Sequence, residues 1–191
     1  MPHIHTNPGE HDMTVSAYIV RMQDDIPMVL VHMHRKFHKL MQCGGHIELN
    51  ESPWASIAHE LTEETGYSLA ELSVLQPNLK PIQLDSAIVH PVPVSMNTHR
   101  VNGDHLHSDL VYAFVAGAVQ QHLPAEGESE DLRWLSLDEL RTEVSNGNAL
   151  EDVFAIYEAI VTNYLEAYEW VPATDYDIND PVINTVSDAN K

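Results

Sequence analysis

Runs of hydrophobic, β-branched and aromatic residues, bounded by turn residues, predict six β-strands. The first two flank the polar segment 23–27, so we expect them to pair as a hairpin. The third is short and leads toward Gly44 and Gly45, where we expect a loop. Asn102-Gly103 is a strong hairpin signal between two later strands. The predicted strands span residues 14–21, 28–34, 37–42, 92–101, 107–119 and 132–135.

The first predicted helix spans residues 52–65. Ser52 is a favoured N-cap, Pro53 is tolerated at the first helical position, and Gly66 ends the helix. One apolar stripe, spaced at about 100° per residue, can pack inward. It consists of Trp54, Ile57, Ala58, Leu61 and Thr65.

Two more helices follow near the C-terminal end. Ser136 and Glu139 form a capping box ahead of a helix at 137–144. Apolar residues at helical spacing then predict a long amphipathic helix at 149–168. The order of strands and helices indicates the α/β class, with a mixed β-sheet sandwiched between helices (α/β/α).

The remaining segments contain few regular elements. Residues 69–75 are expected to form a short helical turn or irregular structure, and the prolines in 76–93 suit loops and edge strands. An acidic loop is expected at 120–131. We expect one domain over residues 1–170 and an acidic tail over 171–191, either an irregular arm or disordered.

The composition excludes several classes of partner. A net charge of −20 argues against a nucleic-acid surface, which needs basic side chains. No apolar run is long enough for a membrane span, and the N-terminus has no signal-peptide pattern. Cys43 is the only cysteine, which fits a reducing, cytoplasmic setting.

Three glutamates crowd one flank of the first helix, at spacings of i, i+3 and i+4. Their carboxylates repel one another, which destabilises a helix but suits a divalent cation. Oxygen ligands favour Mg²⁺, with Mn²⁺ as a second option. The alternative is a solvated acidic face. The three residues are Glu60, Glu63 and Glu64.

The stretch 45–67 resembles the signature of the Nudix hydrolases. We refer to this stretch as the box and to Glu60, Glu63 and Glu64 as the box glutamates. That signature fixes glycines, glutamates and apolar residues over 23 positions. A solvated acidic face would not also fix the first glycine and the first glutamate. The matching residues are Gly45, Glu51, Glu60, Leu61, Glu63, Glu64, Gly66 and Tyr67.

The resemblance implies the Nudix fold over about residues 12–168 and hydrolysis of a diphosphate joined to another group. The box glutamates and the Gly45 carbonyl would bind the metal, with Glu60 as ligand or base. Which glutamate is the base stays open. Glu51 would orient the helix and its neighbours. The substrate would be a nucleoside di- or triphosphate or a nucleotide-linked small molecule, and such domains often pair as homodimers.

Many family members add an acidic ligand from a later loop. Glu128 is the better candidate here and Glu130 the second, against the alternative of a solvated loop charge.

His59 stands where the family has arginine. Histidine is shorter and titrates near neutral pH. Normal activity, reduced activity and a catalytically silent nucleotide-binding or regulatory module all stay open, and the intact glutamates favour activity. An isomerase of isoprenoid diphosphates would need a cysteine acid, for which Cys43 is the one candidate.

Basic residues and histidines provide the substrate-binding candidates. Three basic residues, Arg35, Lys36 and Lys39, lie just ahead of the box, where cations would help an acidic protein bind phosphates. A charged turn between strands is an equal alternative. Paired histidines can bind zinc, but no cysteine or spaced carboxylate completes such a site in the sequence. The candidates are Arg35, Lys36, Lys39 and His46, then His105, His107 and Asp109, with Tyr18 and Phe37 for base stacking.

Overall fold

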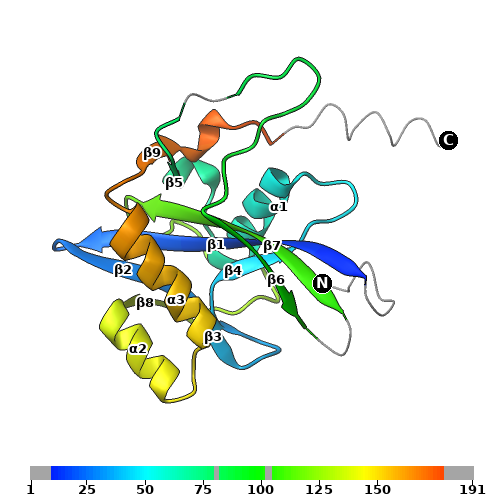
Figure 1. The fold of residues 1–191 in the computed structure, drawn as a ribbon. Helices are drawn as coiled ribbons and strands as arrows, with labels where there is room; N and C mark the ends of the chain where they lie inside the picture. The colour runs from blue at the N-terminus through cyan, green and yellow to red at the C-terminus, as the bar shows by residue number, and fades with distance from the viewer. Residues whose placement is uncertain (1–9, 80–81, 102–104, 179–191) are drawn as a thin grey trace.

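The computed structural model describes residues 10–79, 82–101 and 105–178. Nine strands among these residues form one mixed sheet (Figure 1). They are β1 (His11–Gln23), β2 (Ile26–His34), β3 (Lys39–Met41), β4 (Cys43–His46), β5 (Leu72–Gln76), β6 (Ser95–Arg100), β7 (Leu106–Ala116), β8 (Leu132–Ser136) and β9 (Glu169–Pro172).

The sheet is organised around its central pair, β1 and β7, which run parallel. The main strand order is β3-β2-β1-β7-β5-β9, with β4 on β1, β6 on β7 and β8 on β2. β1 pairs with β2 through its C-terminal half and with β4 through its N-terminal half. The centre of the sheet therefore joins segments that are far apart in sequence.

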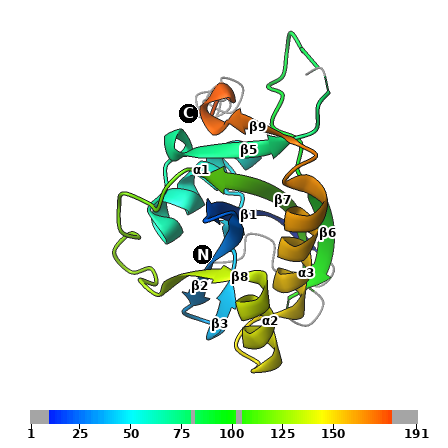
Figure 2. The ribbon, with the colours of Figure 1, turned by 90° about the vertical axis from the view of Figure 1, so that its left-hand side faces the viewer.

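Helices cover both faces of the sheet (Figure 2). α1 (Pro53–Glu60) lies on one face, and α2 (Leu137–Ser145) and α3 (Glu151–Ala159) lie on the other. Side chains of β1 alternate between two cores: Ala17 and Ile19 pack in the core beneath α1, and Tyr18 and Val20 pack in the core beneath α3. The predicted α/β/α sandwich is confirmed.

The expected loop at Gly44 and Gly45 is wrong, because both lie in β4. β1 is 13 residues long and extends beyond its hairpin with β2, so it offers an edge on which β4 pairs. A Cβ at Gly44 would lie 2.2 Å from the carbonyl oxygen of Val15. Glycine is thus required for this close pairing of strands.

Two other segments differ from expectation. Only Leu69–Glu71 is helical within 69–75, and β5 follows because Leu72 and Val74 are buried where β5 pairs with β7 and β9. The helix predicted at 149–168 is α3 followed by a π-helical turn, Ile160–Tyr164.

The capping box of Ser136 and Glu139 is confirmed. The expected turn at Asn102-Gly103 lies outside the described residues. No helix among the described residues is long and apolar enough to cross a membrane. The division of the chain after residue 170 stays a prediction, although β9 spans that position and joins the sheet.

Candidate active site

The helix of the box begins where the sequence predicts. The Ser52 hydroxyl accepts the N–H of Ala55 at 3.2 Å, and Pro53 is the first helical residue. Trp54 and Ile57 are fully buried beneath the sheet. Packing therefore fixes the helix on its apolar side, and its polar side meets β4.

The helix ends in a π-helical turn, Leu61–Thr65, before Gly66. Such turns are frequent at functional sites. Gly66 has a φ of 77°, and a Cβ there would lie 2.1 Å from the carbonyl oxygen of His122. The N–H of Ala125 also donates to the Glu63 carbonyl at 2.7 Å. The acidic loop is thus held against the end of the helix.

Glu60 and Glu64 are buried carboxylates at this end. Glu64 accepts the N–H of Gly44 at 2.9 Å. Burial raises the pKa of Glu60 to about 7 and that of Glu64 to about 8, and repulsion by neighbouring carboxylates adds to both shifts. Both groups would gain from a nearby cation.

Glu63 lies on a different side of the helix and is half-exposed. Its carboxylate is 3.1 Å from His59 Nε2, while His59 Nδ1 is 3.2 Å from Glu51. The Ser56 hydroxyl also donates to Glu51 at 2.8 Å. Burial of the ring lowers the pKa of His59, but the hydrogen bond to Glu63 and the surrounding glutamates raise it above its usual value. The histidine links two carboxylates.

The three box glutamates are not equally buried. The π-helical turn changes the angular spacing after Glu60, so Glu60 and Glu64 are buried while Glu63 faces His59. In the described part of the chain, one group of three ligand-type side chains has its donor atoms within 4.8 Å of one another, and it contains none of these glutamates.

Glu128 lies close enough to the buried pair for its charge to help raise the pKa of both Glu60 and Glu64. The contact between the acidic loop and Glu63 explains this placement. Its role as an additional ligand stays a prediction.

Two side chains outside the predicted metal ligands also line this site. His32 Nε2 is 3.7 Å from Glu64, and burial lowers the pKa of His32 to about 4, so the ring is neutral at pH 7. Cys43 is hydrogen-bonded to Glu64, and burial raises the pKa of its thiol well above the usual value. Cys43 lies two residues before Gly45, the first residue of the box, which was the available signal.

The basic candidates lie in the turn after β2 and on β3. Arg35 and Lys36 are exposed in the turn after β2, with Lys36 over the ring of Phe37. Lys39 donates to the carbonyl of Gly147, in the connection between α2 and α3. Base stacking by Tyr18 is wrong, because its ring is buried against Tyr157.

His46 lies at the end of β4, in a group of histidines and aspartates. Its Nε2 is 3.2 Å from Nε2 of His107 and 3.5 Å from Asp12. His105 lies 3.2 Å from the same aspartate. Thr14 donates to Asp109 at 2.8 Å, beside this group.

A mixed sheet between helices, with a glycine strand leading into a helix of buried glutamates, defines an α/β protein of the Nudix fold. The NUDIX domain family model matches residues 10–154. The chain therefore belongs to the Nudix hydrolase family.

Solved structures agree with this assignment. A NUDIX-family hydrolase from Clostridium perfringens is 27% identical and covers 82% of this chain and 98% of its own, with a TM-score of 0.60. The Ap4A hydrolase of C. elegans is 13% identical over 80% and 100% of the two chains, with a TM-score of 0.57. The NUDIX domain of NrtR from Shewanella oneidensis, complexed with ADP ribose, is 16% identical over 78% and 85%, with a TM-score of 0.53. No curated protein matches the chain.

Nudix hydrolases generally use divalent metals, and the residues here fit such an ion. Glu60 Oε1 is buried and has no hydrogen-bond partner among the described residues. A buried carboxylate oxygen without a partner is costly unless a cation or proton satisfies it. Glu60 and Glu64 are thus suited to hold a divalent metal.

Proposed function

We propose that this protein hydrolyses a diphosphate bond in a nucleoside di- or triphosphate or a nucleotide-linked small molecule, in a reaction that depends on Mg²⁺. The observation that supports this most directly is the pair of buried carboxylates, Glu60 and Glu64, of which Glu64 accepts the N–H of Gly44 just ahead of the box. Mn²⁺ is expected to substitute, since both ions prefer oxygen ligands.

A bound divalent ion would neutralise the diphosphate and activate water. Glu64 and the Gly45 carbonyl would hold it, with Glu63 joining after it turns from His59, and Glu60 would act as ligand or base. The raised pKa of Glu60, about 7, also suits a group that takes a proton from water near neutral pH. Glu60 is therefore our candidate for the general base.

His59 takes over part of the role of the family arginine. It contacts Glu51 and Glu63 from its two ring nitrogens, so it orients both carboxylates without a guanidinium. This supports a working site rather than a silent binding module.

Substrate contacts and assembly are further parts of this proposal. Glu128 would add a ligand from the acidic loop, and Arg35, Lys36 and Lys39 would contact phosphates. His46 instead contacts Asp12 and His107 at the end of β4. Lys39 would first have to release the Gly147 carbonyl. We expect a cytoplasmic homodimer.

A substrate screen tests the proposal. Nucleoside di- and triphosphates, nucleotide sugars, Ap4A and ADP-ribose are incubated with the protein and Mg²⁺, Mn²⁺ or chelator, and both hydrolysis products and nucleotide binding are measured. We expect metal-dependent cleavage of at least one compound. Nucleotide binding without any cleavage would instead support the silent module.

A further inference from the structure

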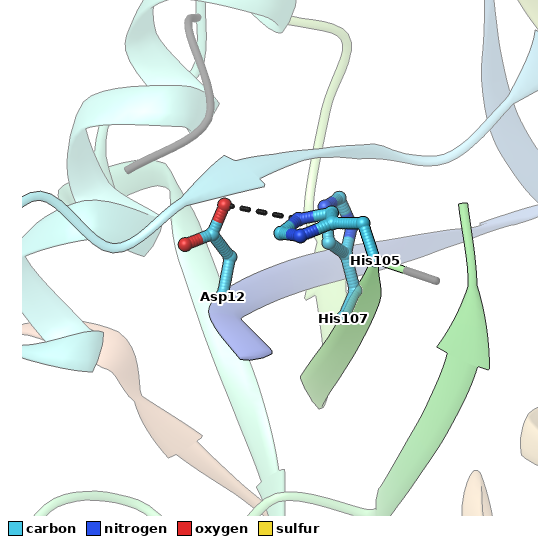
Figure 3. Close-up of side chains that lie close together, drawn as sticks. All are labelled: Asp12, His105 and His107. Atoms are coloured by element: carbon cyan, nitrogen blue, oxygen red, sulfur yellow. Dashed lines mark ion pairs between the residues drawn. The ribbon is translucent and has the colours of Figure 1, made fainter. Parts of the chain in front are cut away.

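A second group of metal-type ligands lies away from the box glutamates, at the point where three strands meet (Figure 3). Asp12 comes from β1, His46 from β4, and His107 from β7, with His105 just before it. We call these four residues the His–Asp cluster. The donor atoms of Asp12, His105 and His107 all lie within 4.8 Å of one another.

The sheet register builds this cluster. Asp12 is the direct partner of His107 across the parallel pairing of β1 and β7, and Thr14 is the partner of His46. His105 immediately precedes β7, and its ring centroid lies 5.3 Å from that of His107. Asp12, the carboxylate that the sequence did not reveal, therefore comes from a strand 95 residues before His107. Thr14 and Asp109, which are hydrogen-bonded, have the same separation in sequence.

The spacing of donor atoms suits a tetrahedral ion. Ligand atoms around tetrahedral zinc lie about 3.3 Å apart when the bonds are roughly 2.05 Å long. Three pairs in the cluster have such distances: 3.2 Å for Asp12 and His105, 3.2 Å for His46 and His107, and 3.5 Å for Asp12 and His46.

The burial of the cluster and the types of its donor atoms also favour a divalent metal ion. Asp12 is 1% exposed, and the side chains of His46 and His105 are each 11% exposed. A buried carboxylate needs a compensating positive charge, which a divalent ion supplies. Imidazole with one carboxylate suits zinc and similar transition metals, whereas Mg²⁺ prefers oxygen alone.

We propose that Asp12, His105 and His107 bind one divalent ion of the zinc class, with His46 beside them as the fourth donor. The ion ties the start of β1, the end of β4 and the start of β7 together. Glu64 binds the N–H of Gly44, two residues before His46, and strand alternation sets the side chains of Cys43 and His46 on opposite faces of β4. This site is thus separate from the box glutamates.

Metal binding to untagged, chelator-treated protein tests the proposal. After dialysis against Zn²⁺, the bound metal is counted by elemental analysis, and Co²⁺ is used as a spectroscopic probe. His105→Ala and Asp12→Asn should each lose about one ion per chain relative to wild type. His122→Ala, in the exposed acidic loop, is the matched control and should keep it. Every variant retains the other histidines, so binding by those is common to all samples.

Two further measurements make the result independent of folding and of the box. The Glu60→Gln/Glu64→Gln double variant should keep the ion, whatever happens to hydrolysis. Wild-type protein with Co²⁺ should show the visible absorption of a tetrahedral nitrogen and oxygen site, and an excess of Mg²⁺ should not remove it. Equal zinc content in His105→Ala, Asp12→Asn and His122→Ala, or Co²⁺ in octahedral coordination only, would overturn the proposal.

Discussion

The two metal-type sites of this protein differ in donors and in how the chain builds them. The box glutamates offer oxygen atoms alone, from one continuous stretch of helix. The His–Asp cluster offers imidazole nitrogen with one carboxylate, from three strands. One sheet thus carries two donor sets suited to different ions. The box glutamates are set by the local sequence, whereas the donors of the cluster are brought together only by the strand register.

The sites also differ in what already balances their charges. In the cluster, histidines lie 3.2 and 3.5 Å from the buried Asp12. In the box, Glu60 and Glu64 repel each other, and Glu60 Oε1 has no partner among the described residues. Loss of metal should therefore affect the electrostatics of the box more than those of the cluster.

The largest expected effect is on hydrolysis when Glu64 is neutralised. Glu64→Gln removes one of the proposed metal ligands and should lower kcat/KM by about 100-fold or more with Mg²⁺. Steady-state kinetics on the best substrate of the screen measures this. Glu158→Gln, exposed on α3, is the control and should behave as wild type. Equal rates in the two variants would contradict a metal role for Glu64.

The next effect is the pH dependence of stability in metal-free protein. The pKa values of Glu60 and Glu64 are raised from 4.5 to about 7 and about 8, so the folded state binds more protons than the unfolded state in this range. The contribution of these two raised pKa values to the free energy of unfolding is fully present below about pH 4.5. It is lost as the pH rises through about 7 and about 8, the pKa values in the folded state. The free energy of unfolding should thus fall between pH 6.5 and 8, by roughly 1.4 kcal/mol per unit for each extra proton.

Urea unfolding in the presence of chelator measures this slope. His32, whose pKa is lowered to about 4, acts in the opposite direction but only below its usual value of 6.5. Glu64→Gln should flatten the slope, and so should excess Mg²⁺. An unchanged slope in that variant would show that Glu64 ionises normally.

A smaller effect is expected where the acidic loop is held against the box. Gly66→Ala places a Cβ against the His122 carbonyl at a positive φ and should cost about 1–3 kcal/mol of unfolding free energy. Gly147→Ala has the same kind of φ, 74°, with nothing within 4 Å of the Cβ, so the difference between the variants isolates the contact. Thermal unfolding of both variants measures this difference. Equal losses of stability in Gly66→Ala and Gly147→Ala would contradict the prediction.

The smallest effect concerns His59. His59→Ala frees Glu51 and Glu63 and should lower kcat/KM a few-fold, since both contacts are partly exposed. His59→Arg restores a charged donor and should match or exceed wild type. Kinetics at pH 6 and 8 checks this: the loss in His59→Ala should be greater at pH 6, where the ring is charged. A gain on alanine substitution would exclude an orienting role.

The sequence predicted the local parts of this molecule well. Ser52, Pro53 and Gly66 set the bounds of the box helix because caps act over a few residues. The helix predicted at 137–144 matches α2 (Leu137–Ser145) for the same reason, and the strand predicted at 132–135 matches β8 (Leu132–Ser136). The α/β/α arrangement followed from the order of elements.

The features that the sequence did not predict depend on pairing between distant segments of the chain. Nothing near Gly44 shows that β1 extends far enough to take β4 as a partner. Nothing near His107 shows that Asp12 lies opposite it. The outward turn of Glu63 depends on the π-helical turn, which the helical spacing does not reveal. Such features depend on register and packing, and these become visible only when the whole sheet is formed.

The parallel pairing of β1 with β7 has a consequence for how the protein folds. Ten residue pairs join these strands across about half of the chain, so closing this contact carries a large loop entropy and is expected to be slow. The box helix can form from neighbouring residues well before. Asp12 and His107 come together only at the late step, and a cobalt signal from their cluster would then follow the completion of the sheet centre in time.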